Sequence, residues 1–314
     1  MKKRLLFFVK IAVSVGLLAV VISWIDLGDL LETYKNFDVR FFALALAVMM
    51  VQTIFSALRW KWILKADGSV VPLRFLWKTY MIGHFLGLFL PTNFGGDVYR
   101  VHALHGTSRD LAKSASSVLF DRLIGLFALI SIFVVASLFL PENPYVWLIL
   151  SVYLVAVAAF LIVTSDRMIA RLPAAPSRWV RLPVKVLRSF NAYRRHTPAL
   201  MLILGIALVF QFNIVVISKL NCLALGVDVP FGRLLVIIPL IFLVESLPIS
   251  INGLGVRESA FSFFFPMIGH AAEQGFGVSL LILFLRYMRG GIGGLLLLAN
   301  IIQSKGAAHT MKST

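Results

Sequence analysis

The sequence predicts an all-α polytopic membrane protein, with about six full transmembrane helices plus two re-entrant helical hairpins in an inverted repeat. Three observations support this fold class. Of the 314 residues, 60% are hydrophobic and the mean hydropathy is +0.92, whereas a soluble domain is typically about 45–50% apolar. The apolar residues fall in runs of about 20, the length that crosses a bilayer. One helix-breaking motif occurs in each half of the chain.

Nine apolar runs follow one another, and each predicts a helix. The first run follows MKKR as a signal peptide would, but it is too long and no small-residue cleavage site follows it, so we interpret it as an uncleaved span. The runs lie near residues 5–25, 41–60, 74–90, 114–140, 145–164, 199–218, 233–247, 259–269 and 277–302.

The connecting segments are short, so we predict a single integral membrane domain over residues 1–314. It consists of a first half at 1–164, a linker at 165–198, a second half at 199–304 and a short tail at 305–314. The linker is basic with interleaved apolar residues, which is typical of an amphipathic helix lying along the headgroups.

The distribution of charge predicts the orientation in the cytoplasmic membrane. The net charge is +16, and in a membrane protein such an excess collects in cytoplasmic loops, so it does not indicate nucleic-acid binding. Segment 166–198 carries eight Lys and Arg residues against the single acid Asp166, which places it in the cytoplasm. Segment 26–40 is acidic and suits the outside. Basic residues near both chain ends predict cytoplasmic N- and C-termini.

The number of crossings predicts the first re-entrant hairpin. If run 74–90 crossed the bilayer fully, the two helices after 113 would return segment 166–198 to the outside, against the strongest charge signal in the chain. The conflict disappears if run 74–90 enters from the cytoplasm and turns back. Runs 233–247 and 259–269 are short and predict the mirror-image hairpin, entering from the outside.

The repeated motif marks where each hairpin breaks. It reads Leu-Pro, four variable residues, Gly, three variable residues, Arg. Its copies are Leu90, Pro91, Gly96 and Arg100, and Leu247, Pro248, Gly253 and Arg257. Pro and Gly interrupt a helix and Arg is costly in hydrocarbon, so we expect two broken helices to form one polar site near the midplane. The alternative is that both copies are ordinary helix ends.

The residues at the two breaks suit a phosphate-sized anion. Glycines leave backbone N–H groups open at a helix start, and arginine binds phosphate oxygens with a planar fork that keeps its charge. The alternative is that the arginines only form structural ion pairs with nearby carboxylates. The substrate-binding candidates are Asn93, Gly95, Gly96, Asp97 and Arg100 at the first break; Asn252, Gly253, Gly255, Arg257 and Glu258 at the second; and Asp121, Arg122 and Glu245 in the neighbouring runs.

Some polar residues in the runs allow two interpretations. Glu245 precedes the second break, and can balance an arginine, stay neutral or relay a proton. Asp121 and Arg122 belong either to the polar site or to the cytoplasmic interface. Arg286 and Arg289 lie three residues apart in the last run and share a helix face that should point into the protein. The glycines after them suit close helix packing.

No catalytic set stands out. The sequence has no G-x-S-x-G nucleophile motif, no Walker loop and no dinucleotide-binding fingerprint. His84, His102 and His105 have no zinc-like pairing with carboxylates. We therefore predict no catalytic residue, no metal and no cofactor, and we do not expect an enzyme.

Three segments carry a family resemblance: LPTNFGGDVYRV, SSVLFDRLIGL and LPISINGLGVRESAF. In this order they resemble the lysylphosphatidylglycerol synthase transmembrane-domain family, a flippase-like group with a hopanoid-associated branch, over roughly residues 10–300. The resemblance implies a multi-pass membrane protein that handles lipid. In the aminoacyl-lipid synthases this domain is fused to a cytosolic catalytic domain. We expect no synthase chemistry here, because the chain has no such domain.

The function predicted from these features is lipid transport. The chain would be a flippase-like translocase that moves a lipid with an anionic or polar headgroup across the cytoplasmic membrane, with membrane lipid as its partner and no nucleic acid. Two alternatives remain open. One is a membrane-embedded transferase acting on a phospholipid or polyprenyl-phosphate, and the other is an accessory subunit that packs against a partner enzyme in the membrane.

Overall fold

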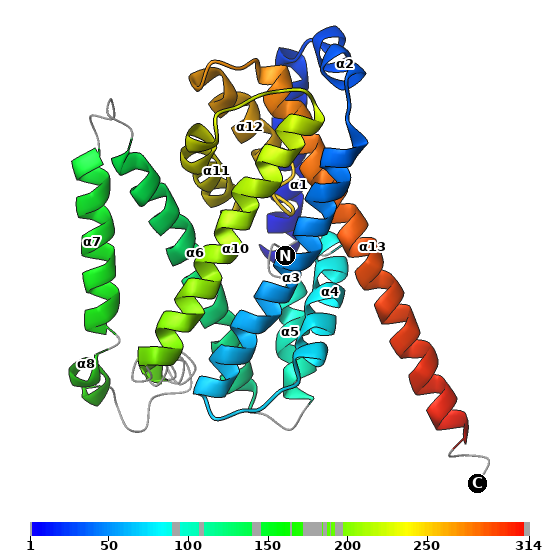
Figure 1. Cartoon of the computed structure of the whole chain (residues 1–314). Coiled ribbons are helices and arrows are strands. Elements are labelled where there is room, and N and C mark those ends of the chain that lie inside the picture. The colour runs from blue at the N-terminus through cyan, green and yellow to red at the C-terminus, as the bar shows by residue number, and fades with distance from the viewer. Residues whose placement is uncertain are drawn as a thin grey trace.

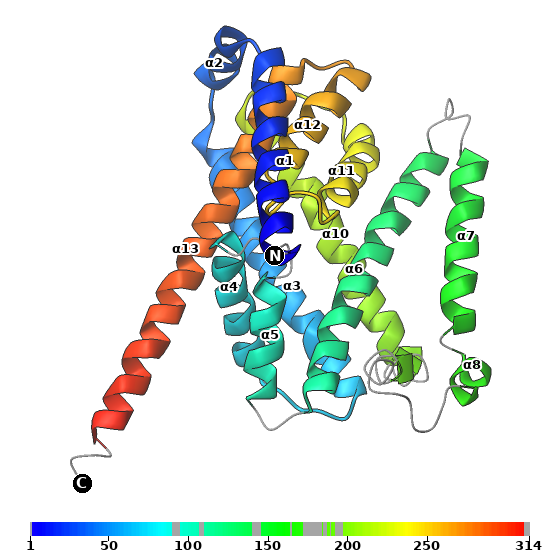
Figure 2. The ribbon, with the colours of Figure 1, turned by 180° about the vertical axis from the view of Figure 1, so that it is seen from behind.

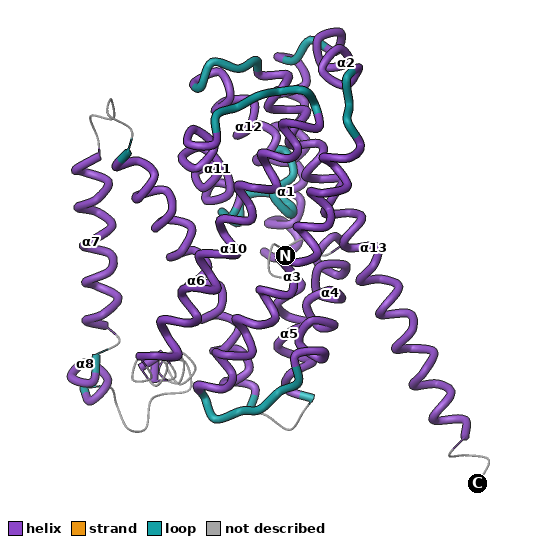
Figure 3. The backbone as a smooth tube through the Cα atoms, viewed as in Figure 1, coloured by secondary structure: helices purple, strands orange, loops and turns teal. Residues whose placement is uncertain are grey.

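A computed structural model describes residues 2–89, 95–106, 110–139, 146–163, 165–171, 184, 187–188, 190–191 and 197–310. Over these residues the chain is helical, and no strand occurs in them (Figure 3). The predicted all-α class is therefore confirmed.

Every predicted apolar run coincides with a helix. Among the described residues, three further helices lie outside these runs: α2 (Leu27–Lys35), α5 (Gly95–His105) and α8 (Asp166–Ala170). The nine that match the runs are α1 (Lys2–Trp24), α3 (Val39–Ala66), α4 (Leu73–Phe89), α6 (Leu111–Leu138), α7 (Val146–Val163), α10 (Thr197–Ala224), α11 (Phe231–Glu245), α12 (Val256–Met267) and α13 (Ala272–Thr310).

Aspartate caps fix where three helices begin. The side chain of Asp26 accepts a hydrogen bond from the Gly28 amide of α2, at 2.6 Å. Asp38 accepts from the Arg40 amide of α3 at 2.8 Å, and Asp110 accepts from the Ala112 amide of α6 at 2.9 Å. Each cap satisfies a donor that the helix leaves unpaired at its start.

Two long helices, α3 and α10, pack against each other through the centre of the molecule (Figure 1). The main hydrophobic cluster joins them to α11, α12 and α13, with Ala45, Cys222, Ile238, Phe261 and Leu285 fully buried. Helix α7 contacts α6 and otherwise stands apart, as the view from behind also shows (Figure 2). Helix packing is therefore densest around α3 and α10, where the polar residues described below are buried.

Two short helix pairs occupy opposite halves of the molecule. In Figures 1 and 2, α4 and α5 lie in the lower half, and α11 and α12 lie in the upper half. Both pairs turn toward mid-height. Helix α13 packs against α4 from the first pair and α12 from the second. It therefore links the two pairs.

Four helices are long and apolar enough to cross a membrane: Val39–Ala66, Leu111–Leu138, Thr197–Ala224 and Ala272–Ile302. A fifth span results if α1 and α2, which are bent by 82° relative to each other, are counted together. This confirms a multi-pass membrane protein, whereas the predicted count of six full spans stays a prediction.

The predicted linker at 165–198 falls mainly outside the described residues. Within it the structure describes α8 and a few isolated positions up to Asn191. The side-chain amide of Asn191 donates to the carboxylate of Asp166 at 2.7 Å. The amphipathic helix expected there, and the division of the chain into two halves, stay predictions.

Candidate functional site

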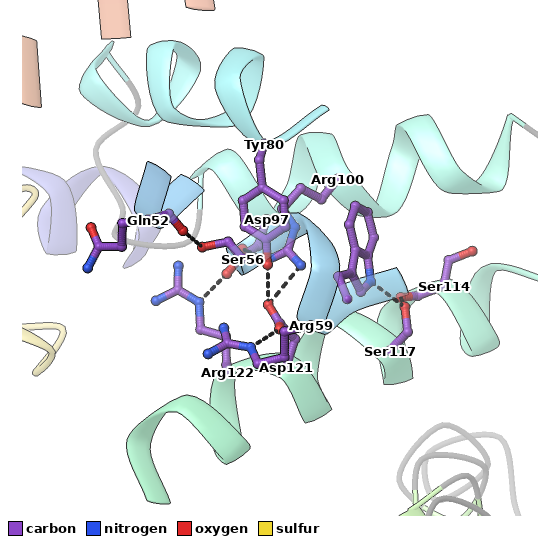
Figure 4. A network of polar contacts seen from close by, with 11 residues as sticks. Gln52, Ser56, Arg59, Tyr80, Asp97, Arg100, Ser114, Ser117, Asp121 and Arg122 are labelled. Atoms are coloured by element: carbon purple, nitrogen blue, oxygen red, sulfur yellow. Dashed lines mark hydrogen bonds and ion pairs between the residues drawn. The ribbon is translucent and has the colours of Figure 1, made fainter. Parts of the chain in front are cut away.

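The first buried polar network is centred on the carboxylate of Asp121 in α6, which is 2% exposed (Figure 4). The Arg59 Nε donates to one of its oxygens at 2.6 Å. The Arg100 Nη2 donates to the other at 2.9 Å, and the Tyr80 hydroxyl also donates there. One carboxylate therefore connects α3, α4 and α5 to α6.

A second carboxylate extends this network toward the protein surface. The Arg100 Nη1 donates to Asp97 at 3.0 Å, one helical turn earlier in α5. The Nε of Arg122, whose side chain is 38% exposed, donates to the other oxygen of Asp97. Among the described residues, three arginines thus share two carboxylates.

Aromatic rings cover the Arg100 guanidinium. Its central carbon lies 4.3 Å from the centre of the Trp60 ring and 4.0 Å from that of Tyr80. The Trp60 indole donates to the Ser117 hydroxyl at 3.2 Å. Ring faces attract a cation, and such contacts strengthen when water is excluded. Arg100 is therefore held by hydrogen bonds to two carboxylates and by contacts with two aromatic rings.

The second network surrounds Arg257 of α12, which is 0% exposed. Its Nη2 donates to Glu258, and its Nη1 lies 3.7 Å from Glu245. The Glu258 carboxylate also accepts from the Gly255 amide at 2.7 Å and from the Ser279 hydroxyl of α13 at 3.2 Å. The Arg286 Nη2 donates to Glu245 at 2.9 Å. Two arginines therefore balance two carboxylates.

The second break requires unusual backbone angles. Gly253 and Gly255 adopt φ of +76° and +81°, which only glycine enters without steric cost. Helix α1 packs directly on this loop. The Ser14 hydroxyl accepts from the Ile251 amide at 3.0 Å, and a side chain at Gly255 would lie 2.6 Å from the Ser14 carbonyl oxygen. The glycines are thus needed for both the turn and the close approach of α1.

A direct contact joins the second break to the end of α4, just before the first. The side-chain amide of Asn252 donates to the Gly87 carbonyl oxygen at 2.5 Å and lies 3.3 Å from that of Leu88. These carbonyls belong to the last turn of α4, where a helix has no internal partners for them. Asn252 therefore satisfies groups that would otherwise stay unpaired inside the protein.

This contact leads to a graded prediction. Asn252 has φ of +52°, so Asn252→Gly should remove the hydrogen bond without backbone strain and cost about 0.5–1.5 kcal/mol. Asn252→Ala should cost about 1–2 kcal/mol more, because alanine is strained at this φ. Unfolding of the purified protein in detergent, followed by tryptophan fluorescence, measures both. Equal stability of the two variants would contradict this account.

The structure brings most of the predicted site residues into these two networks. Asp97, Arg100, Asp121 and Arg122 share the first network, so Asp121 and Arg122 are part of a polar cluster. Glu245, Arg257 and Glu258 share the second. Gly95 begins α5, and a side chain at Gly96 would lie 2.5 Å from the Gly83 carbonyl oxygen of α4. Asn93 lies outside the described residues.

That Arg100 and Arg257 belong to one anion site stays a prediction. Among the described residues, each of these arginines pairs with carboxylates of its own network. A buried guanidinium is unstable without a counter-ion, and these carboxylates are within reach. A cavity of about 530 Å³ lies between α1 and α12, but none of these arginines lines it.

Sequence reasoning missed several members of the networks. Arg59 stands at the end of the predicted run 41–60 and is followed by Lys61 and Lys65, a pattern typical of a cytoplasmic loop. In the structure α3 continues to Ala66 and Arg59 is only 5% exposed. Tyr80, Trp60 and Ser279 carried no signal, because only the packing of separate helices shows which of many buried polar groups meet.

Comparison with known proteins agrees with this architecture. The family model described as "Lysylphosphatidylglycerol synthase TM region" matches residues 7–293. No curated protein matches the chain. The match covers most of the chain, including both networks and both breaks, and the chain belongs to the lysylphosphatidylglycerol synthase transmembrane-region family.

Proposed function

We propose that this protein is a flippase-like translocase that moves a lipid with an anionic or polar headgroup across the cytoplasmic membrane. In this proposal α4–α5 and α11–α12 are re-entrant hairpins from opposite faces, related as an inverted repeat, within six full spans. The family assignment supports a lipid-related membrane protein. The observation that carries the proposal is the hydrogen bond from Asn252 to the end of α4, where the two interrupted segments meet.

The distribution of charge along the molecule supports this topology. Helix α2, which carries Asp29 and Glu32, lies at one end of the molecule (Figure 1). The end of α3 with Lys65, helix α8 with Arg167 and the end of α13 lie at the other. The basic end should face the cytoplasm. Helix α1 begins near mid-height, so the cytoplasmic N-terminus stays a prediction.

The buried charges support a route for headgroups. Moving an isolated charged headgroup through hydrocarbon is prohibitive, because the charge loses its water. Ionisable residues inside a membrane protein mark substrate pathways by default. Here they lie on the hairpins and on the spans that pack against them. The lipid tails would stay in the bilayer while the headgroup passes these networks.

Cysteine accessibility tests the two hairpins. In a Cys222→Ser background, Val70→Cys before α4 and His102→Cys in α5 should react with an impermeant maleimide from the cytoplasmic side, since Val70 is 93% exposed and His102 is exposed. Asp228→Cys before α11 and Ala271→Cys after α12 should react from the outside. If α4 were a full span, Val70 and His102 would label from opposite sides, and the hairpin would be wrong.

Translocation itself is tested in proteoliposomes. Fluorescent phosphatidic acid, phosphatidylglycerol and phosphatidylethanolamine are placed in both leaflets, and an impermeant reductant quenches the outer leaflet. If the protein moves lipid, quenching of at least one probe should proceed beyond the outer-leaflet fraction seen in protein-free vesicles. The same plateau with and without protein for all three probes, and for a polyprenyl-phosphate probe, would contradict the proposal.

A further inference from the structure

Arg289 differs from the other five arginines around the two breaks. Arg59, Arg100, Arg122, Arg257 and Arg286 each pair with a carboxylate. Among the described residues, Arg289 forms no hydrogen bond or ion pair, and its Nε is buried without a partner. The side chain as a whole is half-buried. A charged group with a desolvated, unpaired donor is costly unless an anion joins it.

Arg289 lies deep in the membrane-spanning part of the protein. It is in the middle of the candidate span Ala272–Ile302 of α13. The glycines that follow Arg289 pack against α4, since a side chain at Gly290 would collide with Leu88, and one at Gly293 with the Met81 carbonyl oxygen. Leu88 is in the helix turn that Asn252 contacts. Arg289 is therefore close to the place where the two breaks meet.

The electrostatic surroundings of Arg289 are positive. Arg286, one turn earlier on the same helix, acts on it as a like charge. Arg286 itself pairs with Glu245 and is also within electrostatic range of Glu258. His84 of α4 is within electrostatic range of Arg289, Arg286, Arg100 and Arg122. His84 is thus within electrostatic range of arginines from both networks.

The number of charged groups around the two breaks also indicates an anion site. Among the described side chains, and counting Arg289, six guanidinium groups lie around the two breaks, against the four carboxylates of Asp97, Asp121, Glu245 and Glu258. The excess is two positive charges. A phosphate monoester carries about −1.5 to −2 at neutral pH, so one such group would come close to neutralising it.

We propose that Arg289 binds the phosphate group of the ligand, between α13 and the end of α4, with Arg286 and His84 as its neighbours. The ligand class is a phosphate monoester, and a guanidinium fork is well suited to its oxygens. The inference rests on the proposed function in taking a membrane lipid as the source of this phosphate. Arg100 and Arg257 then hold the hairpins together through their ion pairs.

Binding is measured with purified protein in detergent, where there are no leaflets. The probes are short-chain phosphatidic acid, the matching diacylglycerol without phosphate, and inorganic phosphate. We expect phosphatidic acid to raise the melting temperature of the wild-type protein and diacylglycerol not to do so. In Arg289→Gln the apparent Kd should rise about 10- to 100-fold, the loss expected for a hydrogen bond between charged groups. Arg289→Lys should lie in between, since it keeps the charge but not the fork.

The control is Arg74→Gln, which removes the same charge from an exposed position with no recorded partner. It should bind like the wild-type protein. Without ligand, Arg289→Gln should be at least as stable as the wild-type protein, because it removes a guanidinium whose buried Nε has no partner among the described residues. Replacing an arginine that pairs with a carboxylate would instead lower the stability. Equal binding by Arg289→Gln and the wild-type protein, or a clear loss of stability without ligand, would overturn the proposal.

The probes also separate this site from the translocase proposal. Stabilisation by phosphatidic acid but not by inorganic phosphate identifies a lipid as the ligand, and stabilisation by inorganic phosphate alone would overturn the lipid assignment. Binding that depends on Arg289, in a protein that moves no lipid in vesicles, would leave the site in place and remove only the transport function.

Discussion

Asp121→Asn is expected to destabilise the protein more than any other single charge removal. The Asp121 carboxylate accepts from Arg59, Arg100 and Tyr80, and its loss leaves two buried guanidinium groups without their main counter-ion. Breaking a buried pair by removing one partner costs about 3–5 kcal/mol. Unfolding of the purified protein in mixed micelles, followed by tryptophan fluorescence, measures the loss.

A matched control separates burial from charge. Asp228 pairs with Lys219 at 2.6 Å, but its side chain is 88% exposed. Asp228→Asn removes the same charge from an exposed pair, and such pairs contribute about 0–1 kcal/mol. The lysine lowers the pKa of Asp228, so the stabilisation from this pair should be lost only as the pH falls through that lowered value. If Asp121→Asn were as stable as Asp228→Asn, the first network would not hold the four helices together.

Gly293→Val is expected to have the second large effect. A side chain at Gly293 would collide with the Met81 carbonyl oxygen and crowd Phe85, so α13 and α4 would have to separate. Overpacking typically costs about 1–3 kcal/mol, and we expect the upper part of this range because the obstacle is backbone. The shift would also disturb the approach of α4 to Asn252, so any lipid movement should fall along with stability.

Gly291 provides the control for this substitution. It lies two residues away on the exposed face of α13, where an added side chain meets no atom within 4 Å. Gly291→Val makes the same chemical change in the same helix, with the same effect on helix propensity, but without the collision. A comparable loss in both variants would show that helix propensity, and not the contact with α4, is responsible.

The features that depend on local sequence could be predicted. Hydropathy located all nine apolar helices, because burial in lipid is a local property of a run of side chains. Helices α3, α10 and α13 end six to eight residues beyond the predicted runs. The helix breaks could be predicted for the same reason, since proline and paired glycines act on their own backbone. The ion pair of Arg100 with Asp97 was foreseen because the two residues are one turn apart.

What sequence reasoning could not supply was the choice of partners between helices. Arg59 and Arg286 pair with Asp121 and Glu245, which are 62 and 41 residues away in sequence. Arg289, three residues from Arg286, has no partner within the described chain. Nothing in the local sequence distinguishes these three arginines.

The sequence by itself determined that the chain is helical and membrane-embedded, and that two of its apolar helices end near the repeated Leu-Pro motif. Only the tertiary structure decided which buried charges neutralise one another and which one is left over. The physical reason is how far apart in sequence the interacting residues lie. Hydrophobic burial and backbone conformation depend on neighbouring residues in sequence, whereas the pairing of charges depends on distances of a few ångströms between helices that are remote in the chain.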